Sequence, residues 1–197
     1  MKNIFEEIIE NCKHKKAQSL SKALNKKFSL KSGKDIEKLC YLAYWLFILE
    51  KIELSKKCIN LTHALEFNQN YDIWTFIYSM WGLEIRILKQ EGNNKRIKEI
   101  IDEINKQTLM PTKYETVEEI KISEKKRREN MNFNEISYEK KIQDSLKDDD
   151  INGANEWRFI ALLELIGETE TGFYPNLNKN KDKIEKTIKK YIEEIIK

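Results

Sequence analysis

Histidine and cysteine are the side chains best suited to nucleophilic, acid–base or metal chemistry, and this sequence has few of either. Its histidines are His14 and His63, and its cysteines are Cys12, Cys40 and Cys58, at wide spacing. A structural zinc site needs four soft ligands, usually in close pairs, and no CxxC pair is present. We therefore predict no metal and no cofactor, and we interpret the cysteines as reduced thiols of the core.

No catalytic motif accompanies the two histidines. The sequence contains no phosphate-binding loop of the GxxxxGK[ST] type, no GxGxxG and no HExxH. His63 lies between Thr62 and Ala64 in an apolar stretch, so we interpret it as a helix residue near the edge of the core rather than as a general base. His14 lies in a basic run and is expected to be solvated. The sequence therefore predicts a protein without enzymatic activity.

Acidic groups are concentrated near the C-terminus. Residues 144–170 carry eight acidic and two basic groups, a local net charge of −6. An acidic surface can steer and hold a basic partner. The predicted loop 168–176 also contains aromatic residues, and an exposed aromatic beside charges is typical of a binding hot spot. The predicted partner-binding residues are Asp148, Asp149, Asp150, Glu156, Glu168, Glu170 and Tyr174.

Basic groups are numerous but offset by acidic ones. The chain has 36 Lys and Arg against 33 Asp and Glu, for a net charge of +3, and only five of the basic residues are Arg. Proteins that read nucleic acids favour Arg for its planar, bidentate guanidinium. Nucleic-acid binding by the basic segment 1–35 and by Lys125 to Arg128 is therefore only a third hypothesis.

The elements that must position these residues are predicted to be helices. Gly and Pro are scarce, with six and two residues, whereas β-folds need both for tight turns. Residues 36–47 carry apolar side chains at helical spacing. From Cys40 to Leu49 apolar residues occupy nearly every face of the predicted helix, so we predict that this helix is the most buried. A second apolar stripe runs from Leu54 to Leu65. The predicted class is all-α, with antiparallel helical hairpins stacked into a bundle or short solenoid.

The organisation along the chain follows from the same spacing. We predict a single helical domain over 1–197, with central hairpins in 36–106, a highly charged segment in 113–150 and C-terminal helices in 155–197. Within 113–140 minor strand content is expected, because residues 116–123 alternate like a strand and fit a helix equally well.

Caps, turns and aromatic residues of the central hairpins are also predicted. Asp72 is expected to cap the helix that follows a turn at 67–70. Trp45 and Trp81 are expected in the core, and Tyr44 and Tyr78 at partly exposed positions.

Residues 36–106 resemble tetratricopeptide helical-hairpin repeats. Small and apolar residues fall where that pattern places them, at Leu42, Ala43, Leu46, Ser55, Ile59 and Thr62. Small residues in this pattern let two antiparallel helices approach closely. The sequence departs from the pattern where Ala43 replaces Gly, where Phe67 replaces Pro, and in the period of the next hairpin. The resemblance covers about a third of the chain and implies a binding architecture without activity.

Localisation and function follow from these observations. The most apolar run, Leu39 to Leu49, is eleven residues long, against the roughly 20 that span a bilayer, and acidic residues interrupt the N-terminal segment. We therefore expect a bacterial cytoplasmic protein that does not contact membranes. The leading hypothesis is a non-enzymatic immunity protein that neutralises a cognate toxin, whose basic domain would be its partner. The alternative is a tetratricopeptide-like scaffold or regulator that binds peptides.

Overall fold

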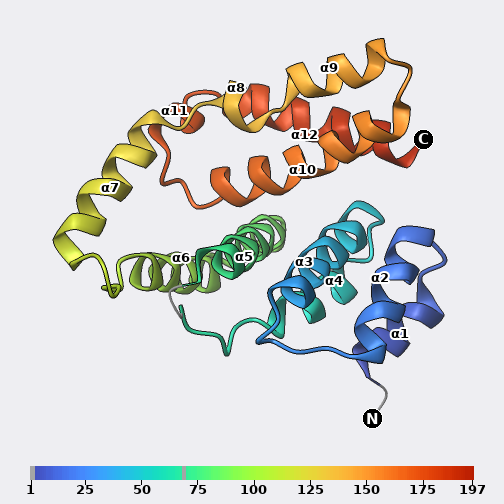
Figure 1. The fold of residues 1–197 in the computed structure, drawn as a ribbon, viewed down its shortest axis with the longest axis horizontal. Coiled ribbons are helices and arrows are strands. Elements are labelled where there is room, and N and C mark those ends of the chain that lie inside the picture. The colour runs from blue at the N-terminus through green and yellow to red at the C-terminus, as the bar shows by residue number, and fades with distance from the viewer. Residues whose placement is uncertain (1–2, 68–69) are drawn as a thin grey trace. The chain divides into compact units, whose positions relative to one another are not determined.

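The computed structural model describes residues 3–67 and 70–197. Within these ranges every regular element is a helix and no strand is present, which confirms the predicted all-α class (Figure 1). The predicted turn at 67–70 falls partly on residues 68 and 69, outside the described residues. The helices are α1 (Ile4–Asn11), α2 (Lys15–Lys26), α3 (Gly33–Ile48), α4 (Ile52–Asn60), α5 (Tyr71–Glu91), α6 (Asn94–Thr108), α7 (Val117–Asn130), α8 (Phe133–Ile136), α9 (Glu139–Lys147), α10 (Ile151–Thr169), α11 (Pro175–Asn178) and α12 (Lys181–Ile196).

The helices form two compact units, which we call the N-terminal unit (Met1–Thr108) and the C-terminal unit (Leu109–Lys197). Each unit buries its own apolar side chains, for example Leu46 in the first and Leu162 in the second. That the chain folds as a single domain stays a prediction.

The N-terminal unit consists of three successive hairpins, α1–α2, α3–α4 and α5–α6 (Figure 1). Helix α3 packs against α2, α4 and α5. The hydroxyl of Ser55 on α4 donates a hydrogen bond of 2.8 Å to the carbonyl of Ala43 on α3, and both residues are fully buried. This bond between buried small residues joins α3 directly to α4.

Burial within this unit differs from the prediction in detail. Helix α5 contains more buried residues than α3, which was predicted to be the most buried helix. Three helices pack against each of them, but α5 has 21 residues and α3 has 16. Asn70 caps α5 by accepting from the backbone of Ile73, so the prediction of Asp72 as the cap was wrong. Trp81 is buried as predicted.

Two neighbouring aromatic residues of α3 exchange their predicted places. Tyr44 is fully buried and donates its hydroxyl to the carbonyl of Ser79 at 2.9 Å, whereas Trp45 is half-buried. Because the Tyr44 hydroxyl has a backbone acceptor within the core, burying this residue leaves no polar atom unsatisfied. Tyr78, also predicted to be partly exposed, is only 7% exposed.

In the C-terminal unit, the charged segment 113–150 contains α7, α8 and α9. Residues 117–123, which fitted a strand and a helix alike, form the beginning of α7. Thr116 accepts from the backbone of Glu119, and the Glu119 side chain accepts from the backbone of Thr116, which forms a capping box. This reciprocal cap nucleates the helix and explains why the strand-like alternation did not produce a strand. Helices α9 and α10 then form a hairpin, and α12 packs along α10.

Across residues 3–67 and 70–197, no helix is both long enough and apolar enough to span a membrane.

Candidate functional site

The turn between α9 and α10 presents three consecutive exposed aspartates. Asp148 ends α9, Asp149 has a backbone φ of 54°, and Asp150 caps α10 by accepting from the backbone of Gly153 at 2.9 Å. The left-handed region is costly for most L-residues, and Asp is among those that tolerate it best. The amides of Asp149 and Asp150 donate to the carbonyls of Leu146 and Ser145 at 3.3 and 2.9 Å. Hydrogen bonds therefore hold the backbone of this turn, although its three aspartates are exposed.

Gly153 leaves room for the same cap. A Cβ at this position would lie 2.1 Å from the Oδ2 atom of Asp150, so the Asp150 side chain would have to move and its hydrogen bond with the Gly153 amide would be disturbed. Ile151, which follows Asp150 and opens α10, is 65% exposed, whereas most other apolar residues of this helix are buried. We call Asp148, Asp149, Asp150 and Ile151 the acidic turn.

The predicted partner-binding residues separate into two groups in the structure. Asp148, Asp149, Asp150 and Glu156 are exposed. Glu170 is only 7% exposed and Tyr174 is fully buried, so the prediction of Tyr174 as an exposed anchor was wrong.

The reason for this error is the course of the chain after residue 167. Helix α10 continues to Thr169 instead of ending at Gly167, which places Glu168 on the helix. There Glu168 lies 3.7 Å from Arg127, whose guanidinium also lies over the ring of Tyr174. Burial raises the pKa of Glu168, and the Arg127 charge opposes that rise. Glu168 therefore contributes to packing inside the C-terminal unit.

Ile151 is an exposed apolar residue that sequence analysis missed. Its sequence signal was weak, because one apolar residue after three aspartates also fits an ordinary start of a helix. Ile122 and Tyr114 are more exposed, at 70% and 85%, so Ile151 is distinguished by its position next to the three aspartates.

The two arginines of α7, Arg127 and Arg128, are engaged within the C-terminal unit. Arg127 forms an ion pair with Glu124 at 3.1 Å, and Arg128 lies 3.4 Å from the same carboxylate. The guanidinium of Arg128 also lies 4.1 Å from the centroid of the Phe173 ring. Beside them is an open cavity of about 310 Å³, lined by Leu109, Lys121, Glu124, Lys125, Arg128, Glu129, Phe173 and Pro175.

A second polar cluster joins α9 to α10. The Tyr138 hydroxyl donates to the Glu164 carboxylate at 2.5 Å, and the Tyr138 ring stacks on Trp157 with 5.6 Å between centroids. The Lys141 ammonium lies 4.0 Å from the centroid of the Trp157 ring and 5.1 Å from that of Tyr138. Burial raises the pKa of Glu164, while Tyr138 and Lys141 oppose that rise.

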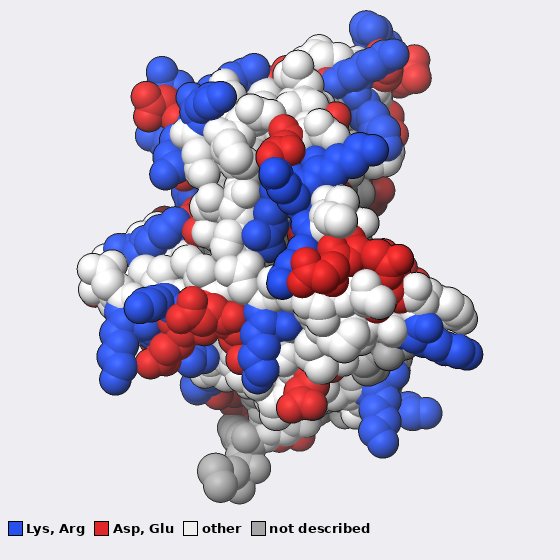
Figure 2. Space-filling view, turned by 90° about the vertical axis from the view of Figure 1, so that its left-hand side faces the viewer, with Lys and Arg blue, Asp and Glu red and all other residues white. Residues whose placement is uncertain are grey.

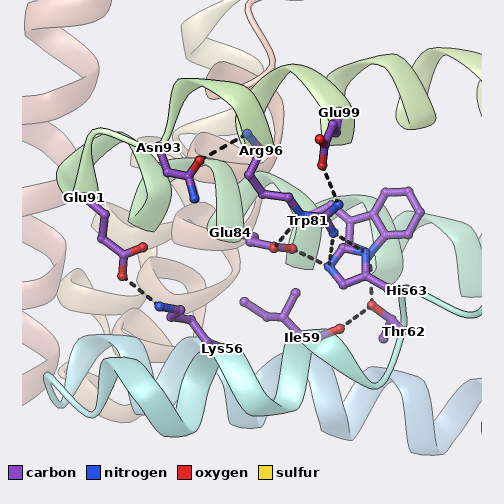
Figure 3. Close-up of polar contacts among 10 residues, drawn as sticks. All are labelled: Lys56, Ile59, Thr62, His63, Trp81, Glu84, Glu91, Asn93, Arg96 and Glu99. Carbon is purple, nitrogen blue, oxygen red and sulfur yellow. Dashed lines mark hydrogen bonds and ion pairs between the residues drawn. The ribbon is translucent and has the colours of Figure 1, made fainter.

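The N-terminal unit has a polar cluster around Glu84, which is only 6% exposed (Figure 3). His63 Nε2 lies 2.5 Å from one Glu84 oxygen, and Arg96 Nε lies 3.7 Å from the other. The indole of Trp81 stacks on the imidazole and donates to Thr62 at 3.0 Å. These contacts connect the turn after α4 to helices α5 and α6.

The position of His63 favours a structural role. It lies in the turn at residues 61–64 rather than in a helix, at the edge of the core. Trp81 covers one face of its ring, and an Arg96 nitrogen lies 3.5 Å from each ring nitrogen. The imidazole is therefore enclosed by groups of its own unit.

The described parts of the chain contain no group of three or more His, Cys, Asp or Glu side chains that could hold a metal ion. The three cysteines are buried free thiols, and burial raises the pKa of Cys40 and Cys58. Their thiolates are thereby disfavoured, which suits residues of the core.

Charges of both signs are distributed over the surface. Figure 2 shows basic and acidic side chains interspersed on the face that it draws. Several are neighbours on one helix, such as Lys121 with Glu118 at 2.8 Å and Lys147 with Asp144 at 3.0 Å. Against this mixed background the acidic turn, with three adjacent exposed carboxylates, is a distinct feature.

The fold and these clusters define an all-α protein of helical hairpins. The chain belongs to a family described as a family of unknown function (DUF6707), which it matches over residues 1–197. No curated protein and no solved structure matches the chain.

Proposed function

We propose that this protein is a non-enzymatic protein-binding protein, most concretely an immunity protein that neutralises a cognate bacterial toxin. The observation that supports the proposal is the acidic turn, which combines three exposed carboxylates with an exposed isoleucine on a fixed backbone. The expected partner is a basic protein domain with an apolar pocket that accepts Ile151.

The physical properties of the acidic turn suit such a partner. A surface that is already ordered loses little conformational entropy on binding, and its carboxylates can accelerate the encounter with a basic protein. Ile151 supplies exposed apolar area directly beside the three aspartates, and burial of that area by a partner would contribute affinity. The turn would therefore contribute both to the association rate and to the lifetime of the complex.

The proposal is tested by isolating the complex from the native host and identifying the bound protein. Co-expression should then restore growth to cells that make the bound protein, if that protein is the toxin. A variant with Asp148→Lys and Asp149→Asn should slow association at low salt by about tenfold or more, because steering depends on these charges. Ile151→Ser should instead speed dissociation.

A control variant carries the same change in charge elsewhere. Asp102→Lys with Glu193→Gln alters two exposed acidic residues, one on α6 and one on α12. Association should remain within about twofold of the unaltered protein. Equal slowing by both variants would mean that overall charge, and not the acidic turn, governs the encounter, and unchanged binding in the first variant would refute the proposed surface.

A tetratricopeptide-like scaffold is a second candidate, supported by the three successive hairpins of the N-terminal unit. In that case the partner would be a peptide bound by the N-terminal unit, and the acidic turn would be irrelevant. Hydrogen exchange in the complex separates the two candidates. Protection confined to the N-terminal unit favours the scaffold, and protection at residues 144–156 favours the immunity protein.

Nucleic-acid binding has less support. Arg127 and Arg128 contact Glu124 and the rings of Tyr174 and Phe173, so a phosphate would have to displace these contacts. We expect no submicromolar affinity for RNA or DNA at physiological salt. A tight complex whose affinity falls steeply with added salt would contradict this expectation.

A further inference from the structure

The cluster of Tyr138, Trp157 and Glu164 has the composition of a site for an organic cation. Two stacked aromatic rings offer π-faces, and a carboxylate lies beside them, hydrogen-bonded to the Tyr138 hydroxyl. An ammonium group is attracted both by the electron-rich face of an aromatic ring and by a carboxylate. In the structure one such group is already there, the ammonium of Lys141, 4.0 Å from the centre of the Trp157 ring.

Lys141 is a replaceable occupant of this cluster. The residue is exposed and belongs to α9, whereas Trp157 and Glu164 belong to α10 and are half-buried. A cation–π contact at an exposed site is weak, and the long lysine side chain gains rotational freedom when it leaves. The Tyr138 ring stacks on Trp157 and the Tyr138 hydroxyl donates to Glu164, so the contacts among these three residues do not depend on Lys141.

Tyr138 is held in an unusual backbone conformation at this place. Its φ is 51°, in the left-handed region that a bulky residue seldom adopts, and it immediately precedes α9. Such conformations persist where the surrounding structure imposes them, and they concentrate at binding sites. Here the conformation stacks the Tyr138 ring on Trp157 while its hydroxyl reaches Glu164.

We infer that Tyr138, Trp157 and Glu164 form a binding site for an alkylammonium group, which Lys141 occupies in the free protein. The natural ligand is a lysine side chain of the protein partner, and this identification rests on the proposed function. The acidic turn and the cation site lie on the same α9–α10 hairpin, so a basic partner would engage the first and displace Lys141 from the second.

The site is tested without any partner by titrating the protein with n-butylammonium, which reproduces the end of a lysine side chain. The resonance of the Trp157 indole N–H, assigned through Trp157→Phe, reports binding. Lys141→Ala and Lys141→Gln should each tighten binding by about threefold or more, because the internal competitor is removed. Lys140→Ala, which removes a neighbouring exposed lysine, should leave binding unchanged.

Two further variants identify the groups that bind. In the Lys141→Ala background, Trp157→Leu should abolish the binding of n-butylammonium, and Glu164→Gln should weaken it. n-Butanol, which has the same chain without the charge, should not shift the Trp157 resonance. The inference is overturned if Lys141→Ala binds n-butylammonium no more tightly than Lys140→Ala does, or if n-butanol competes equally.

The proposed function can fail separately from this site. If Lys141→Ala gains affinity for n-butylammonium while partner binding proceeds without protection of residues 138–164 from hydrogen exchange, the cation site stands and the proposed protein interface is wrong. If the partner protects this hairpin but n-butylammonium binds no variant, the interface stands and the cation site is refuted.

Discussion

The two units of the molecule use their aromatic residues in different ways. In the N-terminal unit aromatic rings pack against one another, with 5.4 Å between the centroids of Trp74 and Trp81. In the C-terminal unit several rings lie under cations, as Phe173 does under Arg128 and Phe133 under Lys183. The first arrangement fills a core, and the second covers part of a ring with a charged side chain.

This difference determines which contacts can be exchanged. A ring packed among other rings is surrounded by protein atoms, and its removal leaves a cavity. A ring under an exposed lysine, as Trp157 is under Lys141, can exchange one cation for another at low cost, because the departing charge returns to water. We therefore expect stability to depend mainly on the N-terminal core and recognition mainly on the C-terminal unit.

The largest expected effect is at Leu46, which is fully buried on α3. Leu46→Ala should lower the free energy of unfolding by about 2–5 kcal/mol, because it removes apolar contacts and leaves a cavity. Lys126→Ala, at an exposed position of α7, should change it by less than about 0.5 kcal/mol. Urea unfolding measures the free energy of both variants. Equal effects would show that Leu46 on α3 is not part of the core.

The next effect concerns Glu84 and tests whether the His63 cluster is structural. Glu84→Ala removes a buried carboxylate that contacts both His63 and Arg96, which should cost about 1–3 kcal/mol. Glu99→Ala removes the other carboxylate that contacts Arg96, at 3.2 Å, from an exposed position and should cost less than about 1 kcal/mol. Similar losses from both variants in thermal unfolding would contradict the role assigned to burial.

Much of the fold could be predicted from the sequence. The apolar spacing of residues 36–47 predicted α3, and the scarcity of Gly and Pro predicted the all-α class. The segment 116–123 could not be decided in this way, because Ile120 and Ile122 fit a strand and a helix alike. Its helical state depends on the reciprocal cap between Thr116 and Glu119, together with burial of Ile120 alone while Ile122 remains 70% exposed.

The candidate site could be predicted only in part. The run Asp148 to Asp150 was recognisable because three adjacent carboxylates are rarely buried. Tyr174 was misplaced because sequence spacing does not reveal that the chain after α10 folds back into the core. The contact of Lys141 with Trp157 joins residues sixteen positions apart on two helices, and no local pattern encodes the pairing of those helices.

Replacing Gly153 by Ala should change the free energy of unfolding by an intermediate amount, and in the direction opposite to the usual one for a helical glycine. Replacing a helical Gly by Ala normally stabilises a helix, by about 0.5–1 kcal/mol. Here the new Cβ would collide with the Asp150 carboxylate, so Gly153→Ala should destabilise by about 0.5–2 kcal/mol through loss of the cap. In an Asp150→Ala background the collision disappears, and Gly153→Ala should become neutral or stabilising. Thermal unfolding of the four proteins measures this reversal, and a loss that persists without Asp150 would contradict the proposed clash.

The smallest expected effect is the contribution of Glu164 to the pH dependence of stability. Glu164 belongs to the cluster that contains Lys141. Burial raises the pKa of this carboxyl above its ordinary value, so in the pH range between the two values the folded protein binds more protons than the unfolded chain. The stability that Glu164 contributes is therefore present below the ordinary pKa of a glutamate. It is lost as the pH rises through the raised pKa of Glu164 in the folded protein.

Glu164→Gln removes that titration while its amide oxygen can still accept from Tyr138. The variant should be slightly more stable than the unaltered protein at pH 7 and should lose this advantage as the pH falls to about 4. The Tyr138 hydroxyl opposes the rise in the Glu164 pKa, so in a Tyr138→Phe background the advantage at pH 7 should grow. Urea unfolding between pH 4 and pH 8 measures the difference in the free energy of unfolding between the variant and the unaltered protein. If that difference is constant across this range, the Glu164 carboxyl is not desolvated as its position in the hairpin implies.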